Sequence, residues 1–367
     1  MAEFSRDSIR NIALIAPHGA GKTSLAEAML FMHGATDKLG KVDDGSSTLD
    51  YESEEKNRNM SINSHVAFFE TKNHFINVVD TPGFLNFLYE TDSAIQISDG
   101  AVLLVEAVQG EAPVQVRKYW EMAGDIPRLI FVNKLDRENT SLEDTVNSIS
   151  NELGVKALLF TLPIGEEGNF NAVIDFVKMK AYTYDSDGNT QGIPIPEDMI
   201  EKAKAAREKI VEAVAELDDE LLVKYLDGQE IDEDLMIKML HQGILDAKIY
   251  PVFAGSATNL LGIKALVVGI CRYLPSPIER NSVSAKNSEG DEVQLEPKED
   301  GQTAAYVFKT ISDPYAGKIS IFRVLSGAIK ADSTIYNSTK GTKEKLGHLH
   351  RLIGKKEYPV DVARCGD

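Results

Sequence analysis

The hydrophobic positions between residues 10 and 160 form short, continuous apolar runs, separated by polar or amphipathic stretches. Continuous runs rich in β-branched residues are typical of parallel strands covered by helices on both faces. We therefore predict a doubly wound α/β sheet, with its last strand after a long gap, from Ile12–Ala16, Phe75–Val79, Ala101–Val105, Leu129–Val132 and Ile249–Ala254. A helix over Gly262–Leu274 is expected to follow and to stop at Pro275.

The stretch before that last strand has a different pattern. Residues 182–197 are rich in Gly, Pro, Asp and Tyr, whereas residues 200–221 carry apolar side chains at three- and four-residue steps. These steps predict one strongly charged helix. Its acidic face, from Glu201 to Glu220, is either a solvated surface or a contact surface for a basic partner.

The C-terminal part changes from a polar to an alternating pattern. Residues 281–302 are charged and lack periodicity, which predicts a linker or surface loop. The segments Ala304–Lys309 and Lys318–Val324 alternate between apolar and polar residues and are followed or preceded by glycines. This pattern predicts the start of a β-barrel.

Length and charge narrow the class of protein. A chain of 367 residues is expected to hold two or three domains. Its 39 Lys and Arg against 57 Asp and Glu give a net charge of -18, which repels polyanions and argues against direct DNA binding. Two cysteines cannot form a disulfide framework, and no apolar run approaches the roughly eighteen residues of a membrane span. With an N-terminus too polar for a signal peptide, we predict a cytoplasmic protein without membrane contact.

A candidate phosphate-binding loop follows the first predicted strand and opens a helix. Its small residues let successive backbone N–H groups turn toward phosphate oxygens at the positive end of the helix dipole. Lys22 would reach the β- and γ-phosphates, and the Thr23 hydroxyl would ligate Mg²⁺. Taken alone, the stretch also fits a glycine-rich strand–helix turn. The loop consists of Ala16, Pro17, His18, Gly19, Ala20, Gly21, Lys22, Thr23 and Ser24.

A second candidate, Asp80-Thr81-Pro82-Gly83, ends the predicted strand Phe75–Val79. Asp80 can hold Mg²⁺ through water, and the Gly83 N–H can meet a γ-phosphate. Asp and Gly also end many strands for reasons of turn geometry, so this tetrapeptide alone has a second interpretation.

Two further candidates follow later strands and fit a guanine base. The Asp136 carboxylate can accept from N1–H and the 2-amino group of guanine, donors that adenine does not offer there. Asn133, beside Lys134, would serve the other edge of the base and tie it to the phosphate loop. After the last strand come Gly255, Ser256 and Ala257, of which Ser256 can brace Asp136 and the Ala257 N–H can bond guanine O6.

The four candidates together predict a GTP/GDP site, because all stand at carboxyl ends of strands, where doubly wound sheets bind ligands. A P-loop kinase or ATPase is the alternative from another class, and the residues Asn133–Asp136 disfavour it because ATP would leave a buried carboxylate unpaired. The chain between Asp136 and Ser256 is far longer than one helix and one strand require. An inserted unit is therefore expected before the final strand.

These motifs resemble the translational GTPases of the elongation factor G family, and the resemblance runs through essentially the whole chain. It extends beyond the nucleotide motifs to several other segments. The residues Thr23–Ala28 after the phosphate loop resemble most the elongation-factor-G-like branch of the family. The segments are Gly45–Tyr51, Arg58–Ile62, Pro163–Gly165, Pro251–Phe253, Tyr273–Pro277, Ile311–Gly317 and Phe322–Gly327.

The resemblance implies a domain organisation and partners. It assigns residues 1–157 and 249–280 to a G domain, 158–248 to an inserted G-prime subdomain, 281–302 to a linker and 303–367 to the start of a β-barrel domain II. Family members continue beyond Asp367, so we expect this chain to be the N-terminal part of a longer protein. Implied partners are the ribosome, for the full-length protein, and a ribosomal stalk protein through the inserted subdomain.

The departures from the family concern catalysis. Lys22, Gly83 and the residue after Gly83 are the expected catalytic positions, but Phe84 stands where the family has a water-positioning His. Gly19 replaces an Asp of the phosphate loop, and Ser61 replaces the switch Thr that completes Mg²⁺ coordination with Thr23. We therefore expect a GTP-switched factor of translation elongation. The alternatives are a slow or non-hydrolysing ribosome-binding regulator and a ribosomal-protection or release-type relative.

Overall fold

The computed structural model describes residues 4–107, 114–279, 282–287, 290–313 and 317–367. Its centre is a seven-stranded sheet in the order β2-β3-β1-β4-β5-β11-β6. All neighbouring strands are parallel except β2, which is antiparallel to β3. The predicted doubly wound α/β fold is confirmed. The strands are β1 (Ile9–Ile15), β2 (His65–Glu70), β3 (Phe75–Asp80), β4 (Gly100–Glu106), β5 (Arg128–Asn133), β6 (Ala157–Leu159) and β11 (Tyr250–Ala254).

The five strands predicted from apolar runs are all present, whereas the strands β2 and β6 were not predicted. Both missed strands lie at the edges of the sheet. The predicted helix before Pro275 is α9 (Ile263–Tyr273). The other helices of this unit are α1 (Lys22–Met32), α2 (Ser53–Arg58), α3 (Leu88–Ile97), α4 (Gln115–Met122) and α5 (Leu142–Leu153).

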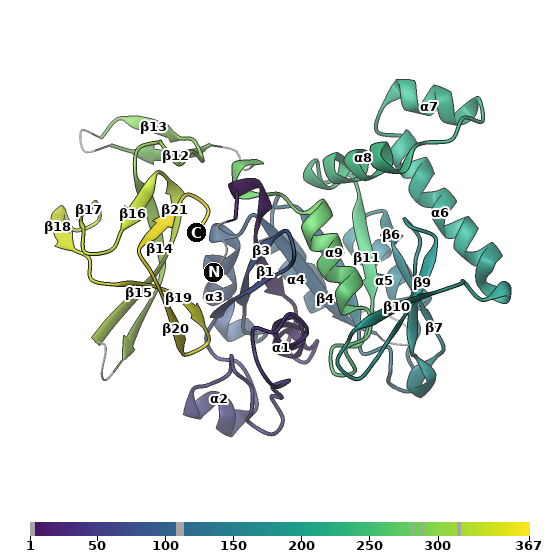
Figure 1. Ribbon diagram of the computed structural model, residues 1–367, viewed down its shortest axis with the longest axis horizontal. Coiled ribbons are helices and arrows are strands. Elements are labelled where there is room, and N and C mark those ends of the chain that lie inside the picture. Colours follow the sequence, from purple (N-terminus) through teal and green to yellow (C-terminus); the bar gives the residue numbers. More distant parts are fainter. Residues whose placement is uncertain (1–3, 108–113, 280–281, 288–289, 314–316) are drawn as a thin grey trace.

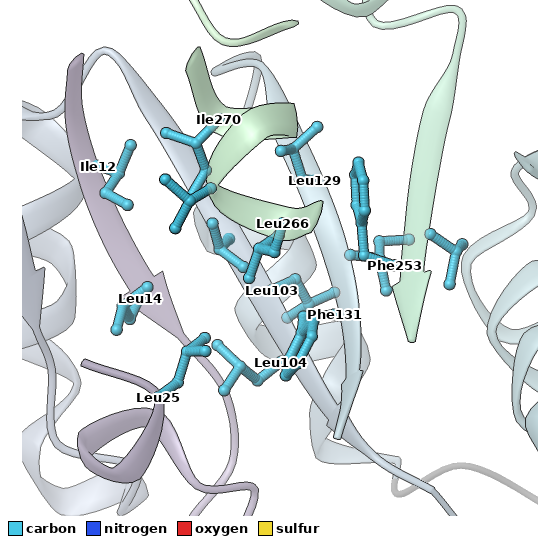
Figure 2. Close-up of a cluster of buried hydrophobic side chains, with 14 of the residues drawn as sticks. Ile12, Leu14, Leu25, Leu103, Leu104, Leu129, Phe131, Phe253, Leu266 and Ile270 are labelled. Atoms are coloured by element: carbon cyan, nitrogen blue, oxygen red, sulfur yellow. The ribbon is translucent and has the colours of Figure 1, made fainter. Parts of the chain in front are cut away.

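The core of this unit lies between the sheet and its helices. Figure 2 shows Leu14, Leu103 and Phe131 of the central strands pointing toward Leu25 of α1 and Leu266 of α9. All five side chains are fully buried. The central strands are therefore rigid supports, and the loops at their carboxyl ends start from well-defined positions.

The inserted unit lies on one side of the central sheet (Figure 1). It has a four-stranded antiparallel sheet in the order β10-β9-β8-β7. The predicted single helix over residues 200–221 is wrong, because Asp218 accepts a hydrogen bond from the Leu221 N–H at 3.0 Å and starts a second helix. The elements are β7 (Thr161–Ile164), β8 (Ala172–Asp175), β9 (Lys180–Tyr184), β10 (Thr190–Ile193), α6 (Ile200–Ala215), α7 (Asp219–Leu226) and α8 (Glu233–Leu245).

The C-terminal strands lie on the opposite side of the central sheet from the inserted unit (Figure 1). The expected linker instead holds a hairpin of β12 (Val283–Lys286) and β13 (Glu292–Leu295). The two strands are antiparallel, and Val283 pairs with Leu295. The remaining strands form antiparallel pairs: β14 (Ala304–Asp313) with β15 (Gly317–Ser326), β16 (Ala328–Lys330) with β21 (Val362–Arg364), β17 (Thr334–Asn337) with β18 (Thr342–Lys345), and β19 (Leu349–Ile353) with β20 (Lys356–Val360).

Parts of four predictions lie outside the described residues. These are residues 1–3 of the polar N-terminus, 108–113 and 280 of the expected G domain, 281, 288 and 289 of the expected linker, and 314–316 of the Ile311–Gly317 segment. Over the described part of the chain, no helix has both the length and the apolar character needed to cross a membrane.

Candidate functional site

Apart from Ser61, which lies in the segment between α2 and β2, the predicted site residues lie where β1, β3, β5 and β11 end at their carboxyl termini. Residues 16–21 connect β1 to α1, Asp80 is the last residue of β3, and residues 81–83 follow it. Because these strands are parallel neighbours, or separated by a single strand, their carboxyl ends converge on one surface. The structure thus brings the four sequence motifs together.

The loop between β1 and α1 is folded around the side chain that it was expected to present to phosphates. The Lys22 ammonium is buried and donates to the carbonyl of Ala16 at 2.8 Å and of Pro17 at 3.3 Å. Burial lowers the pKa of Lys22 to about 8, against the attraction of Asp80 and Asp50. A buried ammonium held by two neutral carbonyls is a site that an anionic phosphate group would stabilise.

Gly83 and the phosphate loop approach each other more closely than any side chain allows. A Cβ at Gly83 would lie 2.6 Å from the His18 nitrogen and 2.6 Å from Lys22 Nζ. The carbonyl of Gly83 accepts from the Tyr119 hydroxyl at 2.8 Å, which fixes the loop after β3. Lys22 Nζ and Gly83, both of which were expected to contact a γ-phosphate, are therefore adjacent in the structure.

The three predicted Mg²⁺ ligands lie side by side. The Thr23 hydroxyl donates to Asp80 Oδ2 at 2.6 Å and lies 3.0 Å from the Ser61 hydroxyl. Asp80 Oδ1 is buried and has no hydrogen-bond partner among the described residues, and the same holds for both oxygens of the neighbouring Asp50. Two hydroxyls and two incompletely satisfied carboxylates form the hard oxygen donor set that Mg²⁺ prefers, so these residues fit that ion.

The charges of this cluster point to the same conclusion. Burial raises the pKa of Asp80 to about 7, and the nearby Asp50 adds to the rise. Burial likewise raises the pKa of Asp50 to about 6, although Ser61 opposes it. Both carboxylates are thus destabilised as anions, and a bound cation would reverse the effect. Sequence reasoning assigned no role to Asp50, because it entered only as part of a family-like segment.

The base end of the site is organised by Asn133. Its amide Nδ2 donates to the carbonyl of Ala20 at 2.8 Å, the predicted tie to the phosphate loop. Gly21 makes room for this tie, since a Cβ there would lie 2.5 Å from Nδ2. Asp136 Oδ1 is buried, and no described residue donates to it. An orphaned carboxylate oxygen at this point suits a ligand with paired N–H donors.

At the base end, the expected contact between Ser256 and Asp136 is not formed, and the bond from the Ala257 N–H to guanine O6 stays a prediction. Asp136 Oδ2 accepts from the Asn259 amide at 3.1 Å, whereas Ser256 lies near Thr258 and does not brace Asp136. The Ala257 N–H, expected to face guanine O6, donates to Asn133 Oδ1 at 2.9 Å. Asn259 was missed because a side chain three residues beyond Ser256 reaches Asp136 only through the fold of the loop.

Two buried carboxylates hold the segment before β2, and neither was found from the sequence. Glu27 of α1 accepts through Oε1 from the Ser47 hydroxyl and from the N–H groups of Thr48 and Leu49. Glu55 accepts from the N–H groups of Ile62 and Asn63, directly after Ser61, and contacts the ring of His65 at 2.9 Å. Glu55 therefore positions the backbone on which Ser61 stands.

The remaining predicted residues occupy supporting positions around the site. The Thr81 hydroxyl donates to the Leu14 carbonyl at 2.7 Å, and the Pro82 carbonyl accepts from the Thr91 hydroxyl at 3.4 Å. Ser24 lies in the first turn of α1. Lys134 donates to Glu106 Oε1 at 2.8 Å, between the ends of β4 and β5. The rings of Phe84 and His18 stack on each other.

Comparison with known proteins gives matches over both parts of the chain. Residues 7–276 match the family model described as Elongation factor Tu GTP binding domain, and residues 302–367 match Elongation factor G domain 2. A crystal structure of a protein from Thermus thermophilus is similar at 30% sequence identity, with a TM-score of 0.86. The match covers 98% of this chain and 51% of that one, so the chain spans about half the length of this relative.

Proposed function

Because this chain belongs to the elongation factor G family of translational GTPases, we propose that its site binds GTP and GDP with Mg²⁺ and that the bound nucleotide governs ribosome engagement in translation elongation. Two groups of residues at the carboxyl ends of the strands support the proposal, one for the phosphates and one for the base. The Lys22, Thr23 and Asp80 cluster matches triphosphate and Mg²⁺ chemistry. The orphaned Asp136 oxygen matches the paired donors of guanine.

Guanine selectivity tests the base end. Asp136→Asn replaces the carboxylate with an amide that can donate to the 2-oxo group of xanthine. We expect weaker GTP binding and stronger xanthosine triphosphate binding, by about 1–3 kcal/mol, the scale of a hydrogen bond to a charged group. Fluorescence titration of both nucleotides measures it. Asp227→Asn, an exposed carboxylate change in the inserted unit, is the control. An unchanged preference for GTP in the Asp136 variant would contradict the assignment.

We propose that GTP hydrolysis by this factor is slow. Phe84 cannot accept or donate a proton at the position of the family's His, and loss of such a group costs roughly 10²–10⁴-fold in rate. Lys22 and Mg²⁺ still stabilise the developing charge, so a slow reaction remains. Phe84→His in the full-length protein, assayed with ribosomes, should turn over faster. Wild-type turnover equal to that of the variant would show that the substitution is not limiting.

The inserted unit offers a surface for a ribosomal stalk protein. Val223 and Leu226 of α7 are 58% and 74% exposed, and they lie among acidic residues that include Glu220 and Asp227. Apolar side chains ringed by carboxylates suit a basic partner with an apolar patch. Val223→Ser with Leu226→Ser should weaken cosedimentation with ribosomes. Ile278→Ser changes an apolar residue outside the insert that is 47% exposed; it is the control and should leave cosedimentation unchanged.

The domain assignment belongs to the same proposal. We assign the inserted unit to a G-prime subdomain and the strands from β14 onward to domain II. The edge strand β6 continues to Leu159 within the central sheet, so the inserted unit starts after that residue rather than at residue 158. The alternative of a ribosomal-protection or release-type factor gains no specific support from the described site.

A further inference from the structure

Two aromatic rings from different loops stack directly beside the phosphate loop. The imidazole of His18 and the ring of Phe84 have their centroids 4.0 Å apart, with 30° between their planes. His18 belongs to the loop between β1 and α1, and Phe84 follows the Gly83 turn after β3. The stack places the imidazole of His18, which can form hydrogen bonds, against the ring of Phe84, which cannot.

The stack stands next to the expected γ-phosphate position. A Cβ at Gly83 would meet both the His18 backbone, at 2.6 Å and 2.7 Å, and Lys22 Nζ, at 2.6 Å. The backbone of His18 therefore borders the point where Lys22 and Gly83 converge. His18 is exposed, so water has access to its ring.

We propose that His18 is a catalytic residue for the slow GTP hydrolysis of this factor, supplying a weaker substitute for the missing His at position 84. The imidazole accepts a hydrogen bond from the attacking water, and the Phe84 ring holds the imidazole in place by stacking. This inference rests on the proposed function, because it needs GTP bound at this site. His18 thus supplies the hydrogen-bond acceptor for water that Phe84, at the family's His position, cannot supply.

The reaction balances with His18 as a transient proton acceptor. The water oxygen bonds to the γ-phosphorus while the bond from that phosphorus to the β–γ bridging oxygen breaks, and GDP leaves with the electron pair. Of the two water protons, one stays on the product as HPO₄²⁻. The other passes to an imidazole nitrogen of His18 and is then released to solvent. Lys22 neutralises the charge that develops on the phosphate oxygens.

The charges around His18 favour its neutral, accepting form. Burial lowers the pKa of His18, and the ammonium groups of Lys22 on α1 and Lys134 after β5 lower it further. The carboxylates of Asp80 and Asp50 act on the ammonium of Lys22. A His with a pKa below 6.5 is neutral at pH 7 and accepts a hydrogen bond without first losing a proton.

Three substitutions separate catalysis from packing. His18→Ala removes both the ring and its nitrogens, His18→Phe keeps a ring to stack on Phe84, and His18→Gln keeps a polar group that orients water. Single-turnover hydrolysis of labelled GTP by this chain is the measurement, with GTP affinity titrated in parallel. We expect His18→Ala and His18→Phe to slow hydrolysis at least about 10-fold with unchanged affinity, and His18→Gln to slow it less. His348→Ala, an exposed His in the C-terminal strands, is the control.

Two further readouts exclude a merely structural role. The wild-type rate should fall as the pH drops through the His18 pKa, and this dependence should vanish in His18→Phe. The double variant His18→Ala/Phe84→His, which moves the imidazole across the stack, should recover the rate lost in His18→Ala. Wild-type turnover in His18→Phe would overturn the proposal. Absence of GTP binding by the wild type would instead overturn the proposed function.

Discussion

The G domain and the C-terminal strands bury their side chains in different ways. The seven-stranded sheet shares one continuous core, with central residues such as Leu103 and Phe131 fully buried. The C-terminal strands form separate pairs, and their own buried cluster consists of Val324, Ile329, Leu349 and Ala363. Apolar burial thus dominates in one region and is sparse in the other.

The C-terminal strands contact the G domain through ion pairs and through apolar side chains, which include Ile353 of β19 in the large core. Arg323 of β15 pairs with Asp99 at 2.8 Å, and Lys309 of β14 pairs with Glu90 of α3 at 2.7 Å. Apolar support comes from Tyr358, which packs edge-on against Phe68 of β2. The position of the C-terminal strands therefore depends on a few specific ion pairs together with limited apolar packing, whereas the sheet depends on many apolar contacts.

The largest expected effect comes from the buried ion pair. Arg323→Met removes the guanidinium that also donates to the Ile97 carbonyl, and it leaves Asp99 buried without this charge. Breaking a buried pair costs about 3–5 kcal/mol. We expect the free energy of unfolding, measured in urea, to fall by that amount. Lys318→Met, an exposed cation on the same strand, should change it little. Equal effects of both variants would refute the role given to the pair.

Matched leucine truncations compare the two cores directly. Leu103→Ala opens a cavity in the centre of the sheet and should cost nearer the upper end of the about 2–5 kcal/mol seen for such changes. Leu349→Ala opens a cavity in the small cluster that movement of its neighbours can fill. The loss of unfolding free energy should therefore lie nearer the lower end of this range. Urea unfolding measures both. A larger loss at Leu349 would mean that the C-terminal cluster is the better packed of the two.

A smaller effect is expected where the C-terminal strands meet α3 and the segment before β2. The Lys309 ammonium contacts Glu90 and lies 3.4 Å from both Asn63 and Ser64, just beyond Ser61. Lys309→Met should cost about 1–3 kcal/mol, since it removes hydrogen bonds to a charged group. Hydrogen exchange should also show a weaker response of β14 to GTP binding. Lys330→Met, an exposed cation, provides the control, and an unaltered exchange response would disconnect this contact from the nucleotide site.

The same contrast explains what the sequence predicted. The apolar runs of β1, β3, β4, β5 and β11 and the motifs at their ends follow local rules, so the central strands of the sheet were predicted and the motifs lie together at the ends of these strands. Contacts such as Asn259 with Asp136, or Glu55 with His65, join side chains through the fold and leave no local pattern. The hairpin β12–β13 was missed because its strands are too short to show clear alternation.

The smallest effect concerns a contact between the inserted unit and the segment that leads to the C-terminal strands. Glu279 accepts from the His241 ring of α8 at 2.7 Å and from the Ser276 N–H and hydroxyl. The hydrogen bond from His241, followed by those from Ser276, lowers the pKa of Glu279 from 4.5 to about 2.

Because the folded pKa is lower than the unfolded one, the contact stabilises the protein above pH 4.5, and this contribution is lost as the pH falls from 4.5 toward 2. The side chain is 36% exposed, so solvent screens the effect to less than about 1 kcal/mol. Glu279→Gln should lower the free energy of unfolding at pH 6 but not at pH 2, in urea titrations at both pH values. A loss that is equal at both would assign the contact to packing rather than to the charge of Glu279.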